Sequence, residues 1–278
     1  MKTAEVKNKI KMNASDDIFV KLYPDDSQLA YQKKRYVAAI DEYIKLFGEN
    51  DIEIFSAPGR SEICGNHTDH QRGKVLAVAV DLDAIAVVSR NSNDAIELVS
   101  DGYGKISISL NELAVNEHEK GSSVSLIKGI AAAFKSRGYK VGGFTAYLSS
   151  DVTSGAGLSS SACFEDLIGT ILSYLYNNGC VSGIEIAQIG QYAENVYFGK
   201  PCGLMDQTAC SLGGLVYIDF KNPDEPMVKQ LSGNPVKEGY SLCITDTGSS
   251  HAELTDEYAF ITKEMSKIAG FFGKEVLA

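Results

Sequence analysis

Residues 153–162 of this chain read Thr-Ser-Gly-Ala-Gly-Leu-Ser-Ser-Ser-Ala, and an apolar run with helical spacing, Phe164 to Tyr176, follows at once. The pattern predicts a flexible loop that leads into a helix N-terminus, where unpaired backbone N–H groups and the helix dipole favour an anion. Gly155 and Gly157 would let the backbone approach a phosphate closely, and the serines could cap the helix or bind a phosphate or metal. An ordinary glycine–serine loop with a serine cap explains the same residues, so both interpretations stay open for this stretch alone.

The composition is that of a globular protein, with 44% hydrophobic and 22% charged residues in a chain of 278. That length suits one large domain or two smaller ones. The formal net charge of −10 argues against nucleic acid or an anionic membrane as a partner, but it leaves room for an anionic substrate. We find no bilayer-spanning apolar run and no signal-peptide core. The six cysteines lie in apolar or small-residue contexts, which favours reduced thiols in a cytoplasmic protein.

Apolar periodicity and breaker residues predict a series of helices and strands around the loop. Residues 1–26 are expected to be a polar, partly ordered lead-in. The expected helices cover residues 28–47, 122–137, 159–176, 182–197, 204–211 and 253–272. The expected strands cover residues 51–57, 75–89 (or a bent pair there), 95–100, 105–110, 142–149, 215–220 and 240–245. Strands, then helices, then strands again favour an α+β fold, and Gly213-Gly214 suggests a domain boundary.

A first polar cluster occupies residues 59–73, Gly-Arg-Ser-Glu-Ile-Cys-Gly-Asn-His-Thr-Asp-His-Gln-Arg-Gly, in a turn expected between two strands. Arg60, Asn66, His67 and Asp69 offer donors and acceptors suited to a polyhydroxylated ligand. A solvated turn explains the same composition. A metal site of His67, Asp69 and His70 is a further alternative, although its spacing matches no helical two-histidine motif.

A second polar cluster occupies residues 193–207, Ala-Glu-Asn-Val-Tyr-Phe-Gly-Lys-Pro-Cys-Gly-Leu-Met-Asp-Gln. Glu194 is expected near the end of one helix and Asp206 at the start of the next. The helix dipole alone explains an acid at a helix N-terminus. In a chain that also carries a candidate phosphate loop and a turn suited to a sugar, Asp206 is a candidate general base. The loop lacks the Gly-Lys-Ser/Thr ending of a Walker P-loop, so Lys or Arg must come from elsewhere.

These segments together resemble the GHMP kinase superfamily, and within it the galactokinases. Residues 59–81 are similar to the galactokinase signature, residues 155–166 to the ATP loop GxGLSSSA, and residues 193–207 to the segment with the Mg²⁺ glutamate and the catalytic aspartate. Residues 246–258, Asp-Thr-Gly-Ser-Ser-His-Ala-Glu-Leu-Thr-Asp-Glu-Tyr, resemble the family stretch that ends in a sugar-contacting tyrosine. The resemblance implies a two-domain α+β fold. Its N-terminal domain, like the second-domain fold of a ribosomal protein, would cover residues 27–212, and an incomplete C-terminal α+β domain would cover 213–278.

The resemblance also implies an ATP-dependent sugar 1-kinase that uses Mg²⁺, with a sugar and ATP as its small-molecule partners. Arg60 would stabilise the transferring phosphoryl group, and Asp206 would accept or orient the proton of the sugar C1 hydroxyl. The sugar would contact Asn66, His67, Asp69 and Tyr258. The ATP phosphates would contact Gly155, Ala156, Gly157, Leu158, Ser159, Ser160 and Ser161. Mg²⁺ would be held by Ser160 or Ser161 together with Glu194.

Three departures from the family pattern bear on this expectation. Asn66 stands where the family typically has Glu, which removes a charge-assisted hydrogen bond of about 1.5–3 kcal/mol or marks a different sugar, such as N-acetylgalactosamine or L-arabinose. His70 replaces the usual Tyr. The family's third, glycine-rich motif is not found after Tyr258, and we therefore expect a C-terminally truncated chain. A non-catalytic sugar and ATP sensor is a further alternative, although such a protein departs from the family in the Ser-Ala part of the loop and Ser161-Ala162 is intact here.

Overall fold

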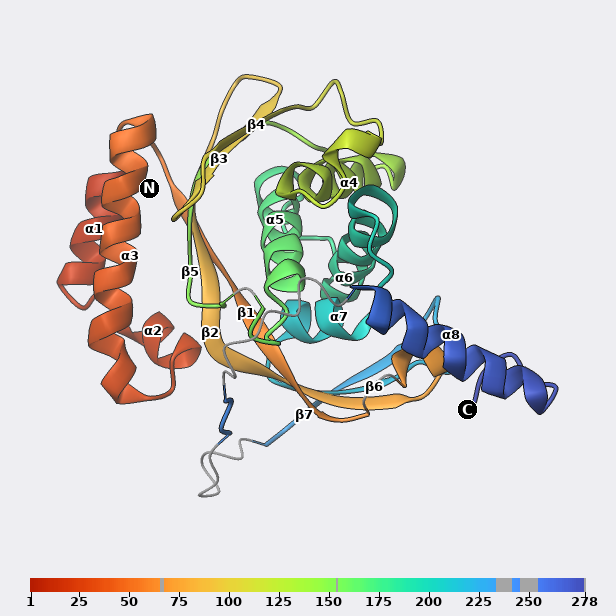
Figure 1. The fold of residues 1–278 in the computed structure, drawn as a ribbon. Helices are drawn as coiled ribbons and strands as arrows, with labels where there is room; N and C mark the ends of the chain where they lie inside the picture. The colour runs from red at the N-terminus through yellow and green to blue at the C-terminus, as the bar shows by residue number, and fades with distance from the viewer. Residues whose placement is uncertain (66–67, 154, 234–241, 246–254, 278) are drawn as a thin grey trace.

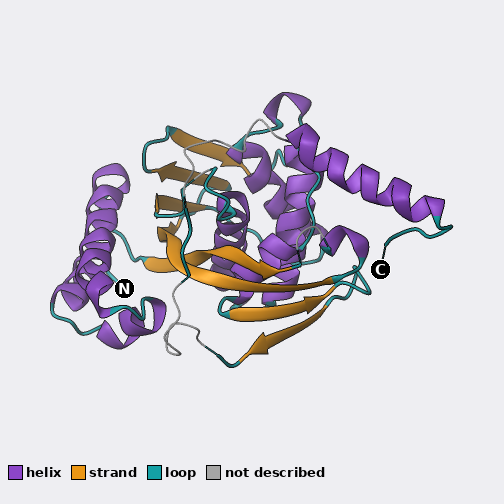
Figure 2. Cartoon of the chain, turned by 60° about the horizontal axis from the view of Figure 1, so that its bottom comes forward, coloured by secondary structure: helices purple, strands orange, loops and turns teal. Residues whose placement is uncertain are grey.

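The computed structural model describes residues 1–65, 68–153, 155–233, 242–245 and 255–277, the last range without the side chains of 255–259. Its centre is a mixed sheet that lies between two groups of helices (Figure 1, Figure 2). Within the described residues, seven strands form the sheet in the order β4-β3-β5-β2-β6-β7, with β1 paired to β2. The strands are β1 (Glu53–Cys64), β2 (Lys74–Arg90), β3 (Ala95–Ser100), β4 (Lys105–Ser109), β5 (Phe144–Ser150), β6 (Leu215–Asp219) and β7 (Met227–Leu231).

The long strand β2 connects the two halves of the sheet. It pairs antiparallel with β1 along one edge. On the other edge its first half, Lys74–Val78, pairs with β6, and its second half, Ala84–Arg90, pairs with β5. Successive side chains of a strand point to opposite faces. Ile85 and Val87 therefore pack against the N-terminal helices, while Ala86 and Val88 pack against the later helices.

The N-terminal layer comprises α1 (Thr3–Lys11), α2 (Asp16–Leu22) and α3 (Asp26–Phe47). The polar, partly ordered lead-in expected over residues 1–26 is therefore wrong as a description of local structure. Ile10, Phe19 and Tyr23 are at most 3% exposed and pack with Tyr36 and Ile40 of α3. Composition concealed these helices, because one or two apolar anchors on a short, otherwise polar helix leave little periodic signal.

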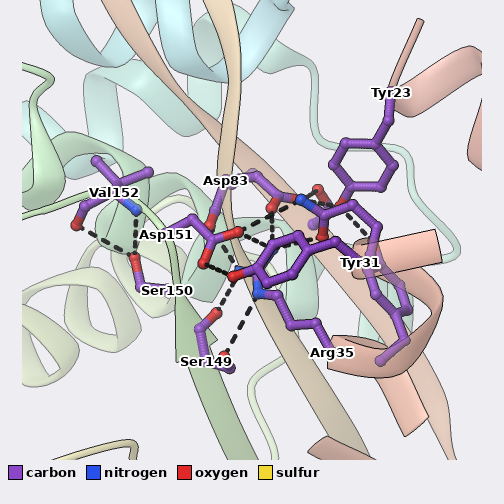
Figure 3. A network of polar contacts seen from close by, with 12 residues as sticks. Tyr23, Tyr31, Arg35, Asp83, Ser149, Ser150, Asp151 and Val152 are labelled. Carbon is purple, nitrogen blue, oxygen red and sulfur yellow. Dashed lines mark hydrogen bonds and ion pairs between the residues drawn. The ribbon is translucent and has the colours of Figure 1, made fainter. Parts of the chain in front are cut away.

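A buried polar network fastens α3 to the sheet (Figure 3). Arg35 Nη1 lies 2.6 Å from Asp83 Oδ1 and 3.1 Å from Asp151 Oδ2. Arg35 Nη2 donates to the carbonyl oxygens of Asp83 and Ser149, at 2.8 and 2.9 Å. Tyr31, also on α3, donates to Asp151. Asp151 directly follows β5 and precedes the glycine–serine loop, so the network fixes the start of that loop to α3.

The second layer comprises α4 (Ser123–Ser136), α5 (Ser160–Asn177), α6 (Gly183–Tyr192), the π-helix η3 (Ala193–Phe198) and α7 (Met205–Leu212). Short 3-10 turns occur at η1 (Asp69–Gln71) and η2 (Glu117–Glu119). After α8 (Thr255–Phe271, Figure 1), Glu275 pairs with Arg72 and the Leu277 N–H donates to Gln71. One sheet with helices gathered from separate parts of the chain confirms the α+β fold. Among the described residues, no helix has both the length and the apolar character needed to cross a bilayer.

Among the strands, three differ from the expected pattern. Strand β1 continues past Pro58-Gly59 to Cys64, because a shift in register between Pro58 and Arg60 realigns it with β2. The described part of the strand expected at 240–245, residues 242–245, belongs to no strand, whereas β7 was not expected. Strands β6 and β7 lie beyond Gly213-Gly214 and yet extend the same sheet. The division into domains at residue 213 stays a prediction.

Candidate active site

Arg60 on β1 forms a bidentate ion pair with Asp206 in the first turn of α7, although the two residues are 146 positions apart in sequence. Arg60 Nε donates to Asp206 Oδ1 at 2.9 Å, and Nη2 donates to Oδ2 at 2.8 Å. Arg60 Nη1 also donates to the carbonyl oxygen of Gly157 at 2.8 Å, and its backbone N–H donates to that of Leu158 at 3.1 Å. Arg60 thus joins segments from each of the three regions singled out in the sequence.

A glycine beside Arg60 permits this close approach. A Cβ atom on Gly59 would lie 2.9 Å from the carbonyl oxygen of Leu158 and 3.2 Å from the side chain of Val152. Any larger residue would push the loop away from β1. Gly59 therefore sets the distance between the arginine and the loop.

The glycine–serine loop enters α5 through left-handed backbone conformations. Gly155, Gly157 and Ser159 have φ values of 80°, 73° and 57°. Ser159 occupies the N-cap position of α5, but its hydroxyl makes no capping hydrogen bond and donates instead to Asp206 Oδ2 at 2.5 Å. The serine cap considered from the sequence is therefore wrong for Ser159. Without a side-chain cap, the N-terminus of α5 keeps backbone N–H groups for an anion.

Asp206 is surrounded by donors that favour its ionised form. Its side chain is 35% exposed. Partial burial raises its pKa, but the ion pair with Arg60 and the hydrogen bond from Ser159 outweigh burial and hold the pKa below the ordinary value. An ionised, oriented carboxylate is suited to accept or align a proton on a substrate hydroxyl.

Glu194 lies on η3, with only 4% of its side chain exposed. Its Oε1 accepts a hydrogen bond from Ser161 at 3.2 Å, and its Oε2 accepts one from Gln207 at 2.9 Å. Hydroxyl and carboxylate oxygens are the ligands that Mg²⁺ prefers. Since Ser161 and Glu194 meet at the N-terminal end of α5, directly after Ser160, this donor set fits the expected magnesium site.

Of the expected sugar contacts, Asp69 is the one whose side chain the structure describes. Asn66 and His67 lie outside the described residues, as does the side chain of Tyr258 on α8. The Asp69 side chain is 9% exposed, and a Cβ atom on Gly203 would lie 1.8 Å from its Oδ2. Asp69 therefore lies against the turn that leads into α7 and Asp206. Asp69 thus places a hydrogen-bond acceptor on the side of the polar cluster that faces this turn.

The alternative metal site of His67, Asp69 and His70 includes a residue outside the described ranges. His70 Nε2 is 3.8 Å from Asp69 Oδ1. Within the described residues, no group of three or more His, Cys, Asp or Glu side chains is placed to hold a metal ion.

Several neighbours of the site were not singled out from the sequence. Glu165 and Asp166 are each 1% exposed on α5, and Gln207 Nε2 donates to Glu165 as well as to Glu194. Burial raises the pKa of Asp166 well above its ordinary value, and Glu165 and Asp206 add to the effect. Glu165 and Asp166 are two adjacent acids inside a run of apolar helix residues. Because acids are almost never buried without a partner, their presence on a buried helix face is unusual and could have been recognised in the sequence.

Two family models match the chain. Residues 41–90 match the galactokinase galactose-binding signature, and residues 125–214 match the GHMP kinases N terminal domain. The galactokinase of Streptomyces coelicolor is 32% identical over 243 residues, which cover 85% of this chain and 61% of that relative. The galactokinase of Bacillus subtilis is 34% identical over 177 residues, which cover 62% of this chain and 44% of that relative. The chain therefore spans about half the length of the curated relatives it matches.

Solved structures agree on the fold. The Lactococcus lactis galactokinase complexed with galactose superposes with a TM-score of 0.62 at 26% identity, over 68% of this chain and 50% of that one. The Methanococcus jannaschii mevalonate kinase has a TM-score of 0.58 over 79% and 71% of the two chains, and at 20% identity it supports the fold alone. The sheet, the glycine–serine loop and the matched models place the chain in the GHMP kinase superfamily. Within that superfamily, the chain belongs to the galactokinase family.

Proposed function

We propose that this chain transfers the γ-phosphoryl group of ATP to the C1 hydroxyl of galactose, giving galactose 1-phosphate and ADP. The observation that carries the proposal is the Arg60–Asp206 pair, held against the carbonyl oxygens of the glycine–serine loop. An acidic group for the acceptor hydroxyl and a cation for the transferring phosphoryl group are thereby adjacent. The relatives named galactokinase support the choice of reaction.

The proposed roles follow from the positions of the residues. The backbone of residues 155–161 and the N-terminus of α5 would hold the ATP phosphates. Arg60 would stabilise charge on the transferring group, and Asp206 would accept or orient the C1 hydroxyl proton. Because phosphoryl transfer passes through a loose transition state, most of the rate would come from alignment and electrostatics.

Magnesium belongs to the proposal on the strength of the Ser161–Glu194 contact. Ser160 or Ser161 and Glu194 would hold the ion, which when bound supplies positive charge to the β- and γ-phosphate oxygens. A cytoplasmic location likewise stays a prediction. It is supported by the six cysteines, all of which lie within the described residues and are free thiols.

The identity of the sugar rests on Asp69 together with Asn66, His67 and Tyr258. Asn66 in place of the family glutamate motivates the second candidate, a kinase for a related sugar such as N-acetylgalactosamine or L-arabinose. Asn can donate as well as accept a hydrogen bond, whereas an ionised Glu only accepts. A sugar with a different substituent could therefore suit this position.

The test is a sugar panel assayed with ATP and Mg²⁺, with the product identified by phosphorus NMR. We expect galactose 1-phosphate, and we expect Asp206→Asn to lower turnover by about 10²–10⁴-fold while ATP still binds, because the variant loses a general base. The exposed Asp224→Asn is the matched control and should behave like the wild type. Substantial turnover by Asp206→Asn would remove Asp206 as the base. Binding of ATP and sugar without any product would favour the sensor.

A further inference from the structure

The carboxylate of Glu194 already has a cation beside it. Lys200 Nζ lies 3.3 Å from Glu194 Oε1, the same oxygen that accepts the hydrogen bond from Ser161. The Glu194 side chain is 4% exposed, whereas that of Lys200 is 40% exposed. The ammonium group therefore approaches a buried carboxylate from the solvent side, at the oxygen that the proposed metal site would use.

The backbone holds Lys200 in this position. The N–H groups of Gly199 and Lys200 both donate to the carbonyl oxygen of Glu194, at 2.9 and 3.1 Å. Gly199 has a φ of 87°, a left-handed conformation that turns the chain at the end of η3. Pro201 follows directly after Lys200. The turn thus brings Lys200 back beside Glu194, so the backbone at the end of the π-helix positions the contact between the two side chains.

The charges around Glu194 explain why a cation is needed there. Gln207 Nε2 donates a hydrogen bond to Glu165 Oε2 and another to Glu194 Oε2, so the two buried side chains share one donor. The nearby Arg60 already donates hydrogen bonds to both carboxylate oxygens of Asp206. An ionised carboxylate that is buried without a partner is strongly destabilising. Lys200 supplies a cation at 3.3 Å from Glu194 Oε1.

We propose that Lys200 is the built-in counter-cation of the metal site, with its ammonium group held at the Glu194 side chain until a metal ion displaces it. Two cations on one carboxylate oxygen repel each other, so the lysine must give way. Its flexible four-carbon stem and its exposure allow that movement. Metal bound alone would meet this competition, whereas metal bound with a nucleotide brings phosphate charge that compensates for the displaced lysine. Lys200 would thus favour the metal–nucleotide complex over the free metal ion.

The test compares Lys200→Met with Lys120→Met. Lys120 is a matched control, because its aliphatic stem would lie 3.1 Å from a Cβ on Gly199 and its side chain is 38% exposed, but its ammonium group pairs with Glu117. Mn²⁺ is titrated into each protein without nucleotide, and the free ion is measured by electron paramagnetic resonance. We expect Lys200→Met to bind Mn²⁺ about tenfold more tightly than the wild type, the effect of one modest competing ion pair. Lys120→Met and Lys200→Arg should match the wild type.

Thermal unfolding of the same proteins gives a readout that is independent of activity. Without metal, Lys200→Met should melt below the wild type, and Mn²⁺ should narrow the difference. Unchanged or weaker Mn²⁺ binding by Lys200→Met would overturn the proposal, as would the absence of Mn²⁺ binding by every variant. The proposal rests on Glu194 as a metal ligand. If the wild type phosphorylates no sugar while the tenfold shift is seen, the kinase function fails and the role of Lys200 stands.

Discussion

Asp166 lies on the second turn of α5 with a carboxyl group that has no hydrogen-bond partner among the described residues. Burial raises its pKa, and the nearby acids Glu165 and Asp206 raise it further. In the folded protein Asp166 therefore keeps its proton at pH values where the unfolded chain has lost it. A neutral acid at this position avoids placing a further charge beside the site.

The titration of Asp166 predicts how stability depends on pH. Because its pKa is higher in the folded state, the folded protein binds more protons, and the free energy of unfolding falls as pH rises above the ordinary aspartate value. The slope from one such group approaches about 1.4 kcal/mol per pH unit. Asp166→Asn mimics the protonated acid, so it should be more stable than the wild type at about pH 8 and nearly equal at about pH 4.

Urea unfolding at a series of pH values measures this difference. The exposed Asp224→Asn controls for the loss of one negative charge and should follow the wild type at each pH. A variant Asp166→Asn that is less stable than the wild type throughout the series would show that Asp166 is ionised and stabilised in the fold.

Single residues also show how far a sequence can predict this site. Arg60, Asp206 and the loop lie in compact motifs, and the structure brings the three into contact, while their functional roles stay a prediction. The hydrogen bond from Ser159 to Asp206 could not be predicted from the sequence, because a serine that precedes a helix is expected to cap that helix. Nothing in the sequence distinguishes Lys200 from any surface lysine, because its partner Glu194 is reached only through the turn at the end of η3.

At the scale of elements, Arg35 joins α3 to β2 and to the end of β5 through Asp83 and Asp151. Arg35 and Asp83 each have 5% of the side chain exposed. Removing one partner of a buried ion pair leaves the other charge uncompensated. We predict that Arg35→Met lowers the free energy of unfolding by about 3–5 kcal/mol, measured by urea denaturation.

A lysine two residues earlier on the same helix gives the control for that prediction. Lys33 pairs with Asp16 at 2.6 Å, but the two side chains are 20% and 42% exposed. Lys33→Met should cost no more than about 1 kcal/mol, because solvent screens such pairs. Similar losses in the two variants would mean that Arg35 contributes through packing of its stem and not through charge.

Elements in which apolar residues recur with a clear helical or strand period were predicted well, whereas elements that depend on tertiary contacts were not. Residues 122–137 carry a wide apolar face and form α4 almost as expected. The second half of β1 is polar, and its strand conformation depends on pairing with β2 after the register shift. The helices α1 and α2 depend on single anchors such as Phe19, which local propensity does not reveal.

At the scale of the whole molecule, the described strands form one sheet that crosses the expected boundary at residue 213. A sheet continuous across that position should unfold as one cooperative unit. The chain contains no tryptophan, so single reporters can be introduced without background. Phe47→Trp reports on α3, and Tyr217→Trp reports on β6. Both positions are half-buried.

We predict that fluorescence from the two variants gives coincident urea transitions, with the same midpoint and the same slope. Far-ultraviolet circular dichroism of each variant checks that the substitution itself has not shifted the transition. Two separated midpoints would instead indicate that residues after 213 form a domain of their own.

The pairing of β2 has a consequence for biosynthesis. Its second half meets β5 early in the chain, but its first half, Lys74–Val78, pairs on that edge with β6, which begins at Leu215. While the ribosome is still making the intervening helices, this segment of the nascent chain keeps an open hydrogen-bonding edge. Open edges recruit strands from other chains. Neighbouring nascent chains on one messenger are therefore expected to be most vulnerable to mispairing at residues 74–78, until synthesis reaches β6.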